Sequence, residues 1–108
     1  MDIETLQAQL LECDRAILEL NYLFSETLQE QELLLNYKNR LRIQVEQKRI
    51  RFFSLKLPFP KVVKNALQHL DQEIQRTQAE LETISCNIES CQLFRISVEC
   101  RLAQSFDG

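Results

Sequence analysis

The stretch Arg51-Phe-Phe-Ser-Leu-Lys-Leu-Pro-Phe-Pro-Lys61 lies near the middle of the 108-residue chain and contains both of its prolines, Pro58 and Pro60. Proline cannot donate a backbone hydrogen bond inside a helix, and it pushes the residue before it out of helical geometry. The one glycine, Gly108, is the last residue. We therefore expect one long helix before this stretch, another after it, and a bend between them.

The composition agrees with an all-α fold. Hydrophobic residues make up 44% of the chain and charged residues 27%, which is too apolar for a disordered tail. We predict a single helical hairpin over 1–108, with helix one at about 3–54, the bend at about 55–60 and helix two at about 61–105. Asp2 is the expected N-cap of helix one. This antiparallel two-helix coiled coil is expected to associate laterally into a four-helix bundle, because a thin hairpin cannot build a thick core.

Apolar residues of the second half recur at alternating intervals of three and four, the pattern of a coiled-coil seam. Ten of the twelve seam positions are apolar, and the exceptions are Thr77 and Arg95. The twelve positions are Val63, Leu67, Leu70, Ile74, Thr77, Leu81, Ile84, Ile88, Cys91, Arg95, Val98 and Leu102. The spacing predicts one face of a continuous helix.

The first half carries a similar seam at its start. Its members are Ile3, Leu6, Leu10, Cys13, Ile17, Leu20 and Phe24. After Phe24 the next apolar residue, Leu28, comes four positions later, and Gln31 falls where an apolar residue is expected. Two consecutive steps of four predict a stutter, which locally unwinds a supercoil. The seam resumes at Leu34.

Two helices joined by a short bend fold back antiparallel. A bend centred on the prolines pairs residues whose numbers sum to roughly 115–118. The expected pairs are Arg95 with Glu19 or Glu26, Lys48 with Asp71 or Glu73, and Cys13 with Cys100.

Several apolar residues lie off the seam, which predicts a second contact surface. The expected partner-binding residues are Leu33, Leu35, Ile43, Phe94 and Ile96. They would bind partner helices, in a homo- or hetero-oligomer. The alternative is that they are scattered surface residues, which are normal when they occur singly.

Charge is segregated along the chain. Residues 1–32 carry eight acidic side chains and one basic one, residues 38–64 carry nine basic and one acidic, and residues 65–108 carry seven acidic and three basic. A hairpin therefore has a basic tip, whose expected contact residues are Arg49, Arg51, Lys56, Phe59, Lys61 and Lys64. We expect this tip to dock an acidic protein surface. The alternatives are that the tip binds an anionic lipid surface, that it pairs with the acidic arms of a second copy, or that its basic side chains are only solvated. Nucleic acid is a weaker case, because the acidic arms repel a phosphate backbone.

Catalytic and metal-binding patterns are missing from the sequence. The four cysteines show no Cys-x-x-Cys spacing, and the single histidine, His69, is far from them. No glycine loop could cradle phosphate. We expect no enzyme activity, no cofactor and no metal. The cysteines are expected to be reduced small hydrophobic residues of a cytoplasmic or nuclear protein without a transmembrane segment.

The segment Tyr37-Lys-Asn-Arg-Leu-Arg42, followed by Val45, a bend and a heptad arm ending in Arg101-Leu102, resembles the flagellar export protein FliJ and its type III secretion counterparts. The resemblance implies a coiled-coil stalk of an export ATPase, or an escort of export chaperones. Small hairpin subunits of kinetochore, tethering or centrosomal complexes are similar to the same degree. The function we expect is a non-catalytic coiled-coil adaptor or scaffold subunit of a multiprotein complex.

Overall fold

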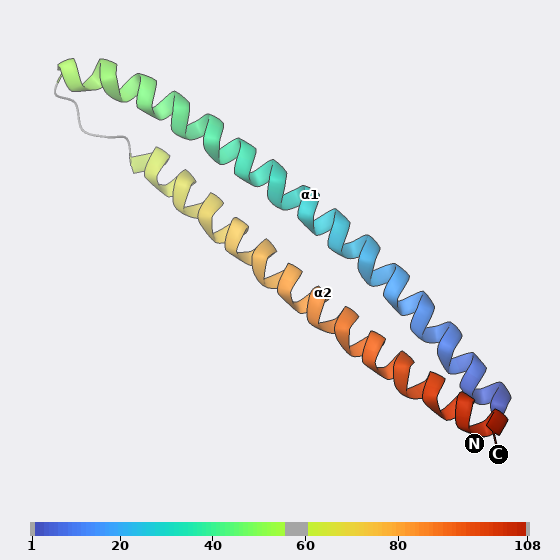
Figure 1. The fold of residues 1–108 in the computed structure, drawn as a ribbon. Coiled ribbons are helices and arrows are strands. Elements are labelled where there is room, and N and C mark those ends of the chain that lie inside the picture. Colours follow the sequence, from blue (N-terminus) through green and yellow to red (C-terminus); the bar gives the residue numbers. More distant parts are fainter. Residues whose placement is uncertain (1, 56–60, 108) are drawn as a thin grey trace. The chain divides into compact units, whose positions relative to one another are not determined.

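The computed structural model describes residues 2–55 and 61–107, without the side chains of residues 48–55 and 107. Helix α1 spans Ile3–Leu55 and helix α2 spans Lys61–Asp107 (Figure 1). No strand occurs in the described ranges. The all-α helical hairpin predicted from the sequence is confirmed. The helices end one and two residues later than predicted.

Helix α1 begins at a side-chain cap. The backbone N–H of Glu4 donates to Oδ1 of Asp2 over 3.4 Å, and the N–H of Leu6 donates to the carbonyl of Asp2 over 3.1 Å. The first bond satisfies one of the backbone donors that a helix start leaves unpaired, and the second is the first backbone hydrogen bond of the helix itself. The Glu4 carboxylate also lies in the first turn, where the helix dipole favours negative charge. The prediction of Asp2 as N-cap is confirmed.

The chain forms two units, each made of one segment from each helix. Unit 1 contains Met1–Glu26 and Leu81–Gly108, and unit 2 contains Thr27–Glu80. Within each unit the segment of α1 lies beside the segment of α2 and runs in the opposite direction (Figure 1). The start of α1 and the end of α2 lie together in unit 1.

The core of unit 1 is apolar. Leu6 and Val98 are completely buried and form one cluster with Leu102, against which Ile3 and Leu10 pack. Cys13 and Leu81 are also buried in this unit. Burial of a leucine or valine side chain contributes about 1.5–3 kcal/mol. Unit 1 is therefore held mainly by the hydrophobic effect.

The core of unit 2 is more polar. Two of its buried residues are Thr27 and Thr77, and Leu70 is the one buried hydrophobic residue among those described in this unit. The Thr77 hydroxyl donates to the carbonyl of Ile74 over 2.7 Å, so its hydrogen-bonding need is met within its own helix. Among the described side chains, fewer apolar residues are buried in unit 2 than in unit 1.

Burial corrects the predicted stutter in helix one. Thr27 is 9% exposed whereas Leu28 is 39% exposed, so the threonine and not the leucine occupies the seam. Gln31 is half-buried at the next seam position, where its Nε2 donates to Oε1 of Gln78 over 3.0 Å. The alternation of three and four is therefore unbroken from Ile3 to Val45. The prediction was wrong because it counted only apolar residues, whereas paired polar residues also fill seam positions.

The seam predicted for helix two is confirmed. Each of its twelve positions from Val63 to Leu102 is buried or half-buried. The neighbours two residues away on α2 are mostly exposed, as the helical period requires.

The predicted pairing register was wrong by about one heptad. Asp14 pairs with Arg95 in unit 1, with 2.7 Å between Oδ1 and Nε, and Lys38 pairs with Asp71 in unit 2. The residue numbers of both pairs sum to 109, whereas a bend centred on the prolines gives roughly 115–118. The last turns of α1 accordingly run past the first residue of α2 (Figure 1).

The physical reason is that the apolar pattern repeats every seven residues. A shift of one heptad still places apolar seam residues opposite each other. What distinguishes the two registers is the polar side chains beside the seam. Arg95 therefore pairs with Asp14 and not with Glu19 or Glu26, and Asp71 pairs with Lys38. The predicted contact of Lys48 lies outside the described side chains.

Candidate functional site

Four exposed side chains follow one another along α2 in unit 1, on the side of the helix that faces away from the seam. They are Cys86, Leu93, Ile96 and Cys100. Their steps of seven, three and four residues keep them within about 80° of helix rotation. We call this surface the α2 stripe. Its spacing is that of a second coiled-coil seam, for which the described chain offers no helix.

A second apolar surface runs along α1 in the same unit. Leu11, Leu18 and Tyr22 are spaced seven and four residues apart, and all three are at least 65% exposed. We call them the α1 stripe. An open hollow of about 460 Å³ lies beside it, lined by Leu18, Glu19, Tyr22 and Leu23. A hydrogen bond to Glu26 and the charge of that carboxylate raise the pKa of Tyr22.

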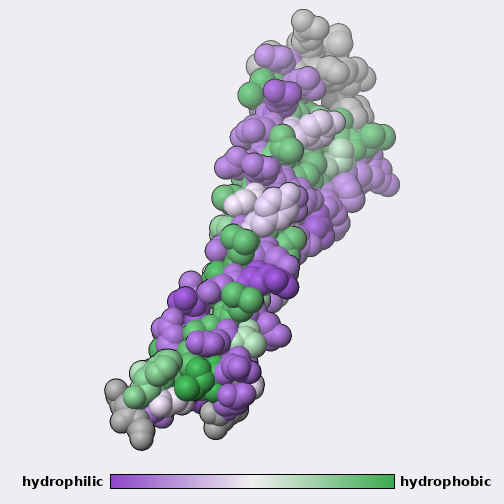
Figure 2. Space-filling view, turned by 90° about the vertical axis from the view of Figure 1, so that its right-hand side faces the viewer, coloured by the Kyte–Doolittle hydropathy of each residue, from purple (hydrophilic) through white to green (hydrophobic). Residues whose placement is uncertain are grey.

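The two stripes face in opposite directions within unit 1, because each lies opposite the seam on its own helix. Figure 2 shows that hydrophobic side chains on one side of the molecule are separated by hydrophilic ones and are not joined into one broad apolar patch. This arrangement suits slender partners such as single helices more than a flat globular surface.

The five residues predicted for helix binding are all exposed. Leu33, Leu35 and Ile43 lie on α1 in unit 2, and Phe94 and Ile96 lie on α2 in unit 1. They do not form one face. Residues two positions apart, such as Leu33 and Leu35, project about 200° from each other around a helix. Of the five, Ile96 belongs to the α2 stripe.

The sequence contained the signal for both stripes, namely a second set of apolar residues at three- and four-residue steps. That signal is visible only after the seam positions are known and removed. Ile96 had stood out as an apolar residue off the seam, whereas its alignment with Cys86, Leu93 and Cys100 had not.

The basic region predicted as a tip is described only in part. Lys61 and Lys64 are exposed in the first turn of α2, which contains no acidic residue. The side chains of Arg49 and Arg51 lie outside the described residues. Lys56 and Phe59 also lie outside them. Two lysines at a helix start are unfavourable for the helix dipole unless negative charge is near.

Three carboxylates surround one arginine in unit 2. Arg76 lies 2.6 Å from Glu30 on α1, and 3.0 and 2.6 Å from Glu73 and Glu80 on its own helix. The hydrogen bonds to these carboxylates raise the pKa of Arg76 above its usual range. The cluster fixes α1 against α2, and its i,i+3 and i,i+4 spacing on α2 could have been found from the sequence.

The two units carry opposite net charge. Unit 1 contains ten acidic and three basic side chains, a formal charge of −7, and unit 2 contains six acidic and ten basic ones, a formal charge of +4. The apolar stripes therefore lie in an acidic setting. A partner helix rich in lysine and arginine would be attracted to unit 1, and an acidic partner to unit 2.

The predicted proximity of Cys13 and Cys100 was wrong. Cys100 is exposed on the α2 stripe, whereas Cys13 is buried on the seam beside Cys91. All four cysteines are free thiols. Among the described residues, no group of three or more His, Cys, Asp or Glu side chains is arranged to hold a metal ion.

Within the described ranges, neither helix has a stretch of sufficient length and hydrophobicity to span a membrane. The chain matches no protein-family model, and no curated protein or solved structure is similar to it.

Proposed function

We propose that the protein is a non-catalytic coiled-coil scaffold, the subunit of a larger assembly that holds partner helices on its apolar stripes. The observation that carries this proposal is the α2 stripe in unit 1, whose exposed residues repeat at coiled-coil spacing. A helix that packed there would bury Leu93 and Ile96, which are 62% and 55% exposed. Each of these burials contributes about 1–2 kcal/mol to binding.

The opposite directions of the two stripes determine where partner helices pack in the assembly. Because the α1 stripe and the α2 stripe lie on opposite sides of unit 1, one partner helix packs on each. This gives a four-helix arrangement with the hairpin in its centre. The partner helices come from further copies of this chain or from another protein.

The basic region of unit 2 supplies a second contact in this proposal. An acidic protein surface binds to its exposed lysines, Lys61 and Lys64, and to the arginines at the end of α1, Arg49 and Arg51. The +4 charge of unit 2 supports this role, since exposed charges of one sign attract partners of the other.

The stripe is tested by the double variant Leu93→Ser, Ile96→Ser. We expect the variant to bind partner helices at least about tenfold more weakly, because two apolar contacts are lost at the centre of the interface. The matched control is Leu33→Ser, Ile43→Ser, which removes two equally exposed apolar side chains of unit 2.

The measurement is light scattering on the purified protein, followed by a comparison of the proteins that co-purify with each variant. If the wild type has a mass above the 12.8 kDa monomer, the stripe variant should return to the monomer and the control should not. The scaffold role of the stripe would be refuted if the wild type is monomeric and the stripe variant retains the same co-purifying proteins.

The basic region is tested by the variant Arg49→Glu, Arg51→Glu, Lys61→Glu, Lys64→Glu. Each change alters the charge by two, so the formal charge of the protein goes from −3 to −11. At low ionic strength we expect the wild type to bind poly-L-glutamate, and the variant to lose at least about tenfold in affinity.

The control is Arg15→Glu, Arg101→Glu in unit 1, which should bind as the wild type does. Equal binding by all three proteins would remove this surface from the proposal. Preference for anionic vesicles or duplex DNA over poly-L-glutamate would reassign it to lipid or nucleic acid.

A further inference from the structure

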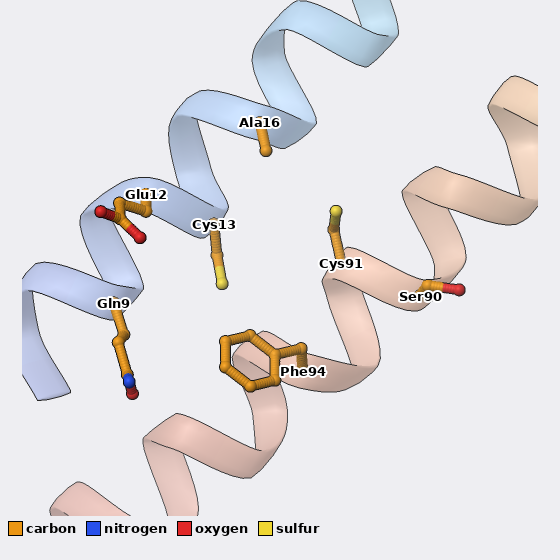
Figure 3. A pocket seen from close by; sticks show the side chains of 7 residues that line it. All are labelled: Gln9, Glu12, Cys13, Ala16, Ser90, Cys91 and Phe94. Atoms are coloured by element: carbon orange, nitrogen blue, oxygen red, sulfur yellow. The ribbon is translucent and has the colours of Figure 1, made fainter.

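Two thiols from different helices reach into the same space in unit 1. Figure 3 shows Cys13 on α1 and Cys91 on α2, both projecting between the two helices. They line a cavity of about 320 Å³ together with Ala16, Ser90 and Phe94, among others. Cys13 is buried, Cys91 is half-buried, and neither is in a disulfide.

The heptad repeat places these cysteines at positions equivalent to those of two residues in one buried cluster. Leu6 and Val98 are packed in one buried cluster across the two helices. Moving one heptad along each helix, toward higher numbers on α1 and lower numbers on α2, leads from this pair to Cys13 and Cys91. In a coiled coil such equivalent positions have equivalent backbone geometry. Both thiols therefore lie at the junction of the two helices, where they line the same hollow.

The surroundings of the pair leave room for a change in side-chain rotamer. Ala16 and Ser90 are small, and the cavity beside the thiols is larger than a methyl group. A disulfide requires Cβ atoms about 3.5–4.5 Å apart, and small neighbours allow the helices to adjust to that distance.

We infer that Cys13 and Cys91 are a site of reversible covalent modification, in which a small disulfide oxidant such as oxidised glutathione joins α1 to α2 through a disulfide. Cys91, the more accessible thiol, reacts first. Its thiolate attacks one sulfur of oxidised glutathione and forms a mixed disulfide, releasing one glutathione thiolate. Cys13 then loses its proton and attacks the Cys91 sulfur, which releases the second glutathione. Two electrons pass from the protein thiols to the oxidant, and both protons end on the two glutathione molecules.

The environment of the thiols agrees with this order of events. Burial, followed by the nearby Cys91, raises the pKa of the Cys13 thiol, so Cys13 stays protonated and protected from the first attack. Once Cys91 carries glutathione, the proximity of the two sulfurs favours the second step over release of the mixed disulfide.

The cross-link would join the two helices of unit 1 without touching either stripe. It closes a loop of about 80 residues, and a loop of this length loses considerable entropy in the unfolded chain. Oxidation would thus hold α1 and α2 of unit 1 together covalently, and reduction would remove that link.

The experiment uses a full-length variant with Cys86→Ser and Cys100→Ser, which leaves only Cys13 and Cys91. Its matched control has Cys13→Ser and Cys91→Ser, which leaves only the two exposed thiols of the α2 stripe. Both are incubated with oxidised glutathione and analysed by intact mass and non-reducing electrophoresis. We expect the first variant to lose about 2 Da as a monomer, the mass of two hydrogens. Its midpoint of thermal unfolding should rise by roughly 10 °C or more, reversibly on reduction. The control should instead carry glutathione or form dimers.

Glutathione adducts that persist on Cys91 without the loss of two hydrogens, or no reaction of the folded protein, would overturn the inference. If the serine changes prevent folding, as judged by circular dichroism, the wild type is oxidised and digested at glutamate residues. A cross-linked peptide pair containing Cys13 and Cys91 then supports the inference, and pairing of Cys13 with any other cysteine refutes it.

Discussion

Replacing Leu6 with alanine is expected to destabilise the protein by about 3 kcal/mol, since removal of a buried leucine side chain costs about 2–5 kcal/mol. Leu6 is 0% exposed and lies in one cluster with Val98 and Leu102 from the other helix. The substitution leaves a cavity at the junction of α1 and α2 in unit 1. The measurement is urea or thermal unfolding followed by circular dichroism at 222 nm. The thermal midpoint should fall by roughly 10 °C or more.

The matched control is Leu11→Ala, on the same helix and in the same unit. Leu11 is 65% exposed, so its replacement should change the free energy of unfolding by less than about 0.5 kcal/mol. Equal effects of the two substitutions would show that Leu6 is not at the junction of two helices, and the assignment of the seam would be wrong.

Backbone amides on the seam of unit 1 are expected to exchange hydrogen with solvent at least about tenfold more slowly than those on the seam of unit 2. A tenfold difference corresponds to about 1.4 kcal/mol in the free energy of local opening. The reason is the contrast between the two cores. Unit 1 buries Leu6, Val98 and Leu102 in one cluster, whereas the described seam of unit 2 contains Thr77 and Gln31. The measurement is hydrogen–deuterium exchange of the native protein read by NMR or mass spectrometry.

The double variant Gln31→Leu, Thr77→Val should slow exchange in unit 2 and leave unit 1 unchanged. The Thr77 hydroxyl donates to the carbonyl of Ile74 on its own helix, so the hydrogen bond that valine removes is one within α2. The control Gln29→Leu makes the same kind of change at an exposed position of α1 and should have no effect. Uniform protection in the wild type would contradict the assignment of a weaker core to unit 2.

The sequence predicted those features that depend on local pattern. The three-and-four spacing placed every seam residue of α2 correctly, because one face of a helix must be covered wherever a second helix lies beside it. The position of Asp2 at the start of α1 followed from the chemistry of its side chain.

The features that the sequence did not predict depend on which of several similar alignments of the two helices forms. A heptad repeat fixes the pairing of two helices only to within seven residues, and the decision is made by single polar contacts such as Asp14 with Arg95. Thr27 and Leu28 compete for one seam position. Thr27 occupies it because Thr27, and not Leu28, continues the alternation of three and four residues on both sides. That Cys13 and Cys91 line the same hollow is a finding of the structure and was not predicted from the sequence.

The exposed residues show the same limit. Leu33 and Leu35 were expected to share a surface because both are apolar and off the seam, but residues two apart point to different sides of a helix. The stripes of unit 1 are found only by asking which exposed residues share one side. Hydrophobicity alone identifies candidates, and the helical period decides which of them can act together.

The pairing of Lys38 with Asp71 across the two helices has a consequence for how such a chain can change in size. Removing one heptad from α1 and the facing heptad from α2, for instance residues 34–40 and 69–75, deletes both members of the Lys38–Asp71 pair and keeps the register of the residues on either side. The molecule can thus be shortened or lengthened in paired increments of seven, whereas an insertion in one arm alone displaces each partner beyond it. A spacer built in this way can be adjusted to a required span without redesign of its interior.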